Sequence, residues 1–74
     1  MKIVLAKKET IHFIGIGGIG MSGLSLIMKA KGFKIQGSDI AINKNIEKLK
    51  KNNVKIFIGQ KKQNLKDVTI VVIS

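Results

Sequence analysis

The chain is 74 residues long, carries a formal net charge of +10 and contains no cysteine. A chain of this length forms at most one small domain, which buries about 60% of the surface that its unfolded form exposes. The lack of cysteine excludes a disulfide framework, and no stretch resembles a signal peptide or a membrane span, so we expect a cytoplasmic protein. Because the sequence stops within the apolar run 71–74, we also expect a C-terminally truncated piece of a longer protein.

The positive charge comes entirely from fourteen lysines, which are spread singly or in pairs along the chain. Arginine, the usual reader of base edges, is absent, and the three phenylalanines form no stacking series. These features predict a solvated basic surface and no nucleic-acid partner. A basic interaction module without enzymatic activity remains an alternative. The opposing acids are Glu9, Asp39, Glu47 and Asp67.

The first two predicted elements flank a run of glycines. Thr10–Ile16 is apolar and β-branched, which predicts a strand, and Ile19–Lys31 is amphipathic, which predicts a helix that Gly32 ends. An abrupt strand-to-helix turn leaves backbone N–H groups unpaired, and glycines let those groups approach an anion closely. The turn at residues 15–23 therefore predicts a phosphate site.

A second strand and helix follow. Lys34–Asp39 reads as a strand, and Asn43 is placed to cap a helix that runs to about Asn52. Ile46 and Leu49 lie three residues apart in this segment, so we expect both side chains to face inward.

The last third of the chain contains two short apolar runs. Val54–Ile58 and Val68–Ile73 show no alternation, which is typical of strands that are covered on both faces of a parallel sheet. The connector 60–67 is brief, so we expect at most one helical turn in it, near Gln63–Lys66. The order β-α-β-α-β-β predicts an α/β fold with a Rossmann-like, doubly wound parallel sheet, in which ligands bind beyond the carboxyl ends of the strands.

Two overlapping registers of the pattern G-x-G-x-x-G occur within residues 15–23. Asp39 ends the second strand, nineteen residues after Gly20, where an acid can accept hydrogen bonds from ribose hydroxyls. This context predicts a nucleotide with a pyrophosphate, held by the N–H groups of residues 17–22. The nicotinamide- or flavin-binding domain of an oxidoreductase has the same features and stays open. The glycines have a structural explanation too, close helix-sheet packing, for which Gly23 is the foremost candidate.

Several other residues have structural explanations. His12 lies inside the first strand beside Phe13, and we expect it to be buried and hydrogen-bonded with no catalytic role. Met21 and Met28 fit the apolar face of the first helix as core residues. Ser22 and Asp39 are each open to a purely structural role, in the first helical turn and in the turn after the strand.

Residues 12–24, HFIGIGGIGMSGL, resemble the opening signature of the Mur ligase family of peptidoglycan biosynthesis. The resemblance is to the members that join L-alanine to UDP-N-acetylmuramate. It continues in the same order through residues 37–39, 56–59 and 71–74, and so covers the chain from Ile11 onward. A related ligase that attaches whole peptides to UDP-muramate during recycling is the runner-up.

The resemblance implies that residues 1–74 are an incomplete N-terminal domain, which binds the UDP-sugar, and that the central ATP-binding and C-terminal domains lie outside this chain. It assigns the uridine to Ser38 and Asp39. At the position after the third strand, where such ligases commonly have histidine, this chain has Gln60. Glutamine can hydrogen-bond the uridine but cannot supply the same ring stacking or charge, so a contact between Gln60 and the uridine stays open. The resemblance assigns the diphosphate to Gly17, Gly18, Ile19, Gly20, Met21 and Ser22.

By the same resemblance, the full-length enzyme uses ATP and Mg²⁺ to activate the muramoyl carboxylate as an acyl phosphate, which the amine of L-alanine attacks to form an amide. The sequence contains no G-x-x-x-x-G-K-[ST] phosphate loop and no cluster of carboxylates or histidines. We therefore predict no catalytic residue and no metal site in this chain. Its expected partner is UDP-N-acetylmuramate, whereas L-alanine and ATP belong to the full-length protein.

Overall fold

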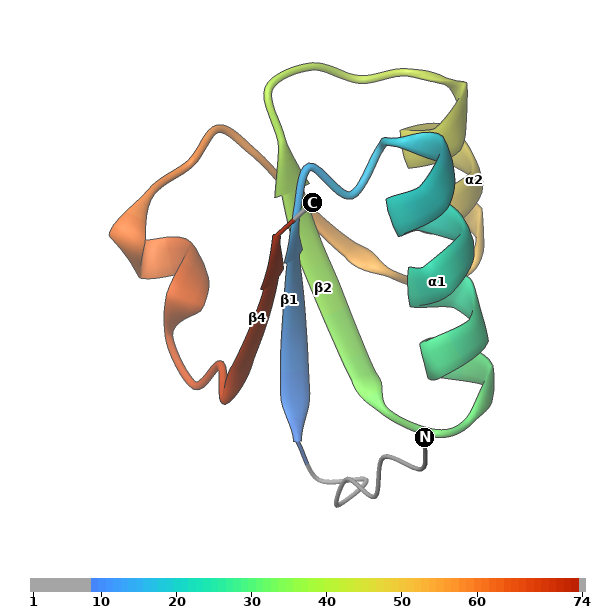
Figure 1. The fold of residues 1–74 in the computed structure, drawn as a ribbon. Coiled ribbons are helices and arrows are strands. Elements are labelled where there is room, and N and C mark those ends of the chain that lie inside the picture. Colours follow the sequence, from blue (N-terminus) through green and yellow to red (C-terminus); the bar gives the residue numbers. More distant parts are fainter. Residues whose placement is uncertain (1–8, 74) are drawn as a thin grey trace.

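The computed structural model describes residues 9–73, which form a parallel four-stranded sheet with two helices on one face (Figure 1). A short 3₁₀ helix, η1, lies on the other side of the sheet. The predicted α/β fold, the parallel sheet and the order of the elements are confirmed. In chain order the elements are β1 (Thr10–Ile14), α1 (Ile19–Ala30), β2 (Lys34–Asp39), α2 (Lys44–Lys51), β3 (Lys55–Ile58), η1 (Lys62–Leu65) and β4 (Ile70–Ile73).

The strand order is β3-β2-β1-β4, so the chain winds outward from β1 in one direction and then returns to the other side of it. The register pairs Ile14 of β1 with Ser38 of β2 and with Ile73 of β4. The direction of winding therefore reverses at β1. In parallel α/β sheets the crevice beside such a reversal, at the carboxyl ends of the strands, is the usual ligand site.

The apolar core lies between the sheet and the two helices. Ile11 and Phe13 of β1 are 2% and 1% exposed, and Ile46 and Leu49 of α2 are completely buried, as their spacing predicts. Asn43 begins α2 as expected, because its side-chain oxygen accepts a hydrogen bond from the Ile46 N–H at 2.9 Å. Each fully buried apolar side chain of the core, such as Ile46 or Leu49, stabilises the fold by about 1.5–3 kcal/mol.

The end of α1 also agrees with the sequence prediction. The N–H of Gly32 donates to the Lys29 carbonyl at 2.9 Å, and the N–H of Phe33 donates to the Met28 carbonyl at 3.3 Å. These two bonds satisfy carbonyl groups that the end of the helix leaves unpaired. Met28 and Met21 pack against the core, as predicted.

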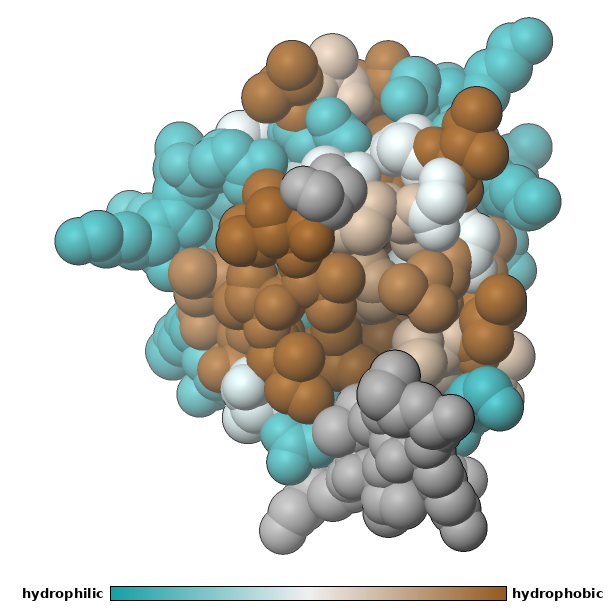
Figure 2. Space-filling model, in the orientation of Figure 1, coloured by the Kyte–Doolittle hydropathy of each residue, from teal (hydrophilic) through white to brown (hydrophobic). Residues whose placement is uncertain are grey.

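Three strands, β1, β3 and β4, differ from the prediction. β1 ends at Ile14 and not at Ile16, because Gly15 adopts a φ of +78° that leaves the extended conformation. The expectation that β3 and β4 are covered on both faces is wrong within residues 9–73, since Ile58 is 47% exposed and Ile73 is 69% exposed. In β4 the physical reason is that the helices cover one face only, and Val71 and Ile73, in register with His12 and Ile14, lie on the other face. Apolar side chains reach the surface in this region of the molecule (Figure 2). Ile58 lies on the same face as Ile56, which packs against the core, but at the end of β3.

The packing glycine is Gly37 of β2, and the expectation for Gly23 is wrong. A Cβ atom at Gly23 would meet nothing within 4 Å. At Gly37 it would lie 2.7 Å from Cβ of Ile16 and 2.8 Å from the carbonyl oxygen of Phe13. Ile16 therefore packs directly on the backbone of β2, and this close approach requires glycine.

Candidate functional site

The turn after β1 is fastened to the end of β2. The N–H groups of Gly15 and Ile16 both donate to the Ser38 carbonyl, at 2.9 and 3.1 Å. The N–H of Gly18 then donates back to the Gly15 carbonyl at 3.1 Å and closes the turn. The glycine run thus has a defined backbone path from the sheet to the first residue of α1.

Gly17 is the tightest point of this turn. Its N–H donates to Oδ2 of Asp39 at 2.8 Å, and its carbonyl accepts from the side-chain amides of Asn43 and Asn45 at 3.3 and 2.8 Å. A Cβ atom at Gly17 would lie 2.7 Å from Oδ2 of Asp39 and 3.0 Å from Cγ1 of Ile46. Only glycine fits here, because any side chain would push the turn away from β2 and α2.

Asp39 lies at the carboxyl end of β2, where the sequence predicts it. Its second carboxylate oxygen accepts from the Ile40 N–H at 2.8 Å, and its backbone carbonyl accepts from the Gly59 N–H at 2.8 Å. Asp39 thereby holds together the ends of all three neighbouring strands: the turn after β1, the loop after β2 and the residue that follows β3.

The N-terminus of α1 keeps free donors. Gly18 occupies the capping position and supplies no side-chain hydrogen bond, and the first turn contains no acidic residue. Ser22 is the first residue whose N–H bonds within the helix, to the Gly18 carbonyl at 2.8 Å. Within residues 9–73, the N–H groups of Ile19, Gly20 and Met21 have no hydrogen-bond partner. Three donors at the positive end of a helix form a suitable site for an anion.

The structure thus divides the six predicted diphosphate residues into two groups. The amides of Gly17, Gly18 and Ser22 are used inside the fold. The Ser22 hydroxyl is also used, because it donates to the Ile19 carbonyl at 3.1 Å, and the side chain is buried. The first group therefore shapes the turn, and the donors of the second group remain available.

Beneath the ends of β1 and β2 lies a hydrogen-bonded set of polar side chains, here called the His12 network: His12, Gln36, Ser38, Gln60 and Asn64. As predicted, His12 is buried, 1% exposed, and hydrogen-bonded. Its ring nitrogens contact Nε2 of Gln36 at 2.7 Å and Oγ of Ser38 at 3.1 Å, and Ser38 donates to Oε1 of Gln60 at 2.5 Å. Burial lowers the pKa of His12 below its usual value, which favours the neutral ring.

Ser38 and Asp39, which the resemblance places at the uridine, occupy different depths. Asp39 is partly exposed, whereas Ser38 is fully buried and reaches the surface only through its bond to Gln60. This network is not evident from the sequence, because its hydrogen-bonded partners lie 22 to 28 residues apart along the chain. The sequence does contain one indication of the network. Gln36 and Ser38 are polar residues at alternate positions of β2, and His12 is a polar residue within the apolar strand β1.

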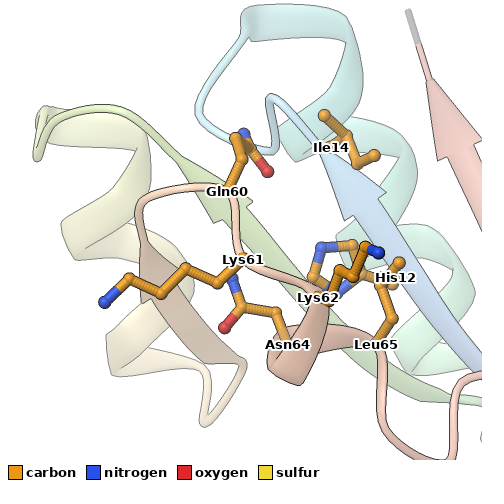
Figure 3. Close-up of a pocket in the computed structure, with 7 residues that line it drawn as sticks. All are labelled: His12, Ile14, Gln60, Lys61, Lys62, Asn64 and Leu65. Carbon is orange, nitrogen blue, oxygen red and sulfur yellow. The ribbon is translucent and has the colours of Figure 1, made fainter.

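Two hollows flank the site. The smaller one, about 190 Å³, lies on the η1 side of the sheet (Figure 3). The larger one, about 500 Å³, is an apolar groove between α1 and β4 that contains none of the predicted site residues. The smaller cavity is lined by His12, Ile14, Gln60, Lys61, Lys62, Asn64 and Leu65.

Among residues 9–73, no three His, Asp or Glu side chains come close enough together to hold a metal ion. Neither α1 nor α2 has the length and apolar character that crossing a membrane requires.

The comparison with known families agrees with this geometry. Residues 10–74 match the sequence pattern described as Mur ligase family, catalytic domain. The chain belongs to the Mur ligase family. The matched residues include the glycine turn and Asp39, and the match agrees with the resemblance of residues 12–24.

Individual Mur ligases are similar over most or all of the chain. A protein of Pelagibacter ubique named UDP-N-acetylmuramate–L-alanine ligase is 66% identical over 74 residues, which is 100% of this chain and 16% of that protein. Ligases of the same name from Rickettsia prowazekii and Rickettsia typhi are 57% and 55% identical over 65 residues, which cover 88% of this chain and 13% of each relative. The chain thus spans a small part of the length of the relatives that it matches.

Proposed function

We propose that this chain is the UDP-sugar-binding part of a ligase that joins L-alanine to UDP-N-acetylmuramate in peptidoglycan synthesis. The observation that carries the proposal is the set of three unpaired amides, of Ile19, Gly20 and Met21, at an uncapped helix N-terminus beside the end of β1. Such donors suit the diphosphate of a UDP-sugar, and each charge-assisted hydrogen bond contributes about 1.5–3 kcal/mol.

In this proposal the remaining predicted residues have separate tasks. Gly17, Gly18 and Ser22 define the path of the turn, so that the three free amides point in one direction. Asp39 borders the uridine and its ribose, and Ser38 acts from below through Gln60. The choice of UDP-N-acetylmuramate as the ligand is supported by the similar proteins, which are named UDP-N-acetylmuramate–L-alanine ligase.

ATP, Mg²⁺ and L-alanine enter the proposal as ligands of the longer protein. The described residues do not fit Mg²⁺, because they offer no cluster of carboxylates, and the sequence has no phosphate loop for ATP. We therefore assign these three ligands to regions outside this chain and derive no chemical step from its residues. The proposal includes a cytoplasmic location, which the absence of cysteine supports.

The test is Gly18→Val. A Cβ atom at Gly18 would meet only the Gly15 carbonyl oxygen, at 3.5 Å, so valine fits the fold. Its branched side chain would nevertheless cover the approach to the free amides. We expect the parent chain to bind UDP-N-acetylmuramate saturably in the presence of excess NAD, and the variant to show no saturable binding by calorimetry.

Gly23→Val is the matched control, because a Cβ atom at Gly23 meets nothing within 4 Å and the residue lies in α1 beyond the free amides. This control is expected to bind like the parent. Equal affinity of the Gly18→Val variant and the parent would refute the proposal. Saturable binding of NAD that UDP-N-acetylmuramate does not displace would favour the oxidoreductase alternative.

A further inference from the structure

The direction of every hydrogen bond in the His12 network follows from one backbone carbonyl. The carbonyl of Asn64 can only accept, so the Gln36 amide must face it with nitrogen, at 2.7 Å. The same nitrogen lies 2.7 Å from Nδ1 of His12 and donates its second hydrogen there. Nδ1 is therefore the unprotonated nitrogen of a neutral ring, and the hydrogen is on Nε2.

The remaining two bonds continue in the same direction. The Nε2–H of His12 donates to Oγ of Ser38, so the single Ser38 hydrogen is free for the next bond. It goes to Oε1 of Gln60. Because Ser38 needs an acceptor, the Gln60 amide must present its oxygen inward and its nitrogen outward. In Figure 3 the amide oxygen of Gln60 points toward the side of β1, and the amide nitrogen points in a different direction.

The outward nitrogen of Gln60 lies at the edge of the sheet where the ligand is proposed to bind. Gln60 follows Gly59, whose N–H is bonded to the Asp39 carbonyl at the end of β2. The loop is held from the other side too, because the Asn64 side-chain amide donates to the Gly59 carbonyl at 2.9 Å. The Gln60 side chain is exposed, and within residues 9–73 its amide nitrogen has no hydrogen-bond partner.

We infer that Gln60 is a specificity-determining residue that offers the pyrimidine of a UDP-sugar a hydrogen-bond donor and never an acceptor, and that His12 and Ser38 are positioning residues that fix this orientation. The inference rests on the proposed function. Uracil carries a carbonyl oxygen at position 4, which accepts, whereas cytosine carries an amino group there, which donates. A fixed donor at Gln60 selects uracil over cytosine.

The test compares UDP with CDP as probes, using calorimetric titration of the 74-residue chain. We expect the parent to bind UDP about tenfold more tightly than CDP. With CDP, the Gln60 amide nitrogen would face the amino group of cytosine, and these two donors would both lack an acceptor. In Gln60→Glu the side chain keeps its shape and still accepts from Ser38, but it presents only an acceptor. Its preference for UDP is expected to vanish or to reverse in favour of CDP.

Two further variants separate orientation from charge and stability. Gln63→Glu introduces the same charge at an exposed amide of η1 and is expected to keep the parent's ratio of UDP to CDP affinity. Ser38→Ala removes the hydroxyl that holds the Gln60 amide, so the amide can turn over. The ratio of UDP to CDP affinity in this variant is expected to fall toward one. Loss of stability alone does not change the ratio, because it lowers the apparent affinity for both nucleotides equally.

Nitrogen-15 NMR of the His12 ring provides a readout without any ligand, and we expect the hydrogen on Nε2. A hydrogen on Nδ1, or a Gln60→Glu variant that keeps the parent's ratio, would overturn the inference. Equal binding of UDP and CDP by the parent would overturn it while leaving the proposed function intact. Failure of the parent to bind UDP at all would overturn both.

Discussion

The two faces of the sheet are held by different forces. On the helix side, apolar residues such as Ile11, Phe13 and Ile46 are buried, and their side chains need no hydrogen-bond partner. On the η1 side, His12 and Ser38 are equally buried, but each makes hydrogen bonds whose direction is fixed. Apolar packing depends on volume and tolerates rearrangement, whereas a buried polar network tolerates one arrangement of donors and acceptors. The helix side therefore supplies stability, and the η1 side supplies orientation.

The largest loss of stability is expected when apolar volume is removed from the helix side of the sheet. Ile11→Ala leaves a cavity in the core and is expected to lower the free energy of unfolding by about 2–5 kcal/mol. Urea unfolding followed by circular dichroism measures the change. Ile19→Ala is the control with the same change of side chain, because Ile19 is 88% exposed, and an effect within about 0.5 kcal/mol is expected.

A smaller effect is expected from the η1 side. Ser38→Ala leaves the Nε2–H of His12 buried without an acceptor and should cost about 1–3 kcal/mol. Ser25→Ala is the matched control, because Ser25 is also fully buried but donates only to the carbonyl of Ser22 in its own helix. Equal costs of the two substitutions in urea unfolding would contradict the view that the Ser38 hydroxyl satisfies a buried donor of the His12 network.

The smallest expected effect is a dependence of stability on pH. The pKa of His12 is lowered in the folded chain by burial, so the unfolded chain binds the proton more readily. Its contribution to stability is fully present above the unfolded pKa of about 6.5 and is lost as the pH falls through the lowered folded pKa. The groups that face the ring are the neutral Gln36 and Ser38, and Lys62 lines the same cavity.

His12 is the only histidine of the chain, so His12→Phe is a direct control for this pH effect. The parent should lose unfolding free energy between pH 7 and pH 5 in urea titrations, and the variant should show a flatter profile. A parent profile that rises on acidification would contradict the buried, neutral ring.

Local signals explain which elements the sequence predicts well. Gly32 marks the end of α1 and Asn43 the start of α2, because both act through hydrogen bonds to residues within one helical turn. β2 was predicted with its bounds intact, Lys34–Asp39, since it is flanked by turns. The glycine turn was also predicted, because its glycine pattern lies within residues 15–23, although the residues that fasten it to β2 and α2 lie outside this segment.

Features that depend on distant pairing were not predictable in this way. The role of Gly37 requires knowing that Ile16 crosses over β2, and the His12 network requires knowing that η1 returns under the sheet. The apolar runs of β3 and β4 also do not reveal whether one face or both faces of the sheet are covered. Apolar residues favour burial, but their composition does not say which elements cover them. The sequence therefore places the glycine turn and Asp39 at one end of the sheet, but it does not say which amides of the turn stay free of hydrogen bonds within the fold.

The link between Gly17 and Asp39 has a consequence for affinity. One carboxylate joins the loops after β1 and β2, and the Gly59 N–H bond adds the loop after β3, so the three loops behave as a single preorganised unit. The entropy of ordering them is lost during folding, so that binding of the proposed nucleotide would not have to supply it and more of the contact energy would remain for affinity. Shortening the side chain at position 39 would release the turn after β1 and should therefore weaken the proposed binding even at the free amides of α1, which Asp39 does not bond.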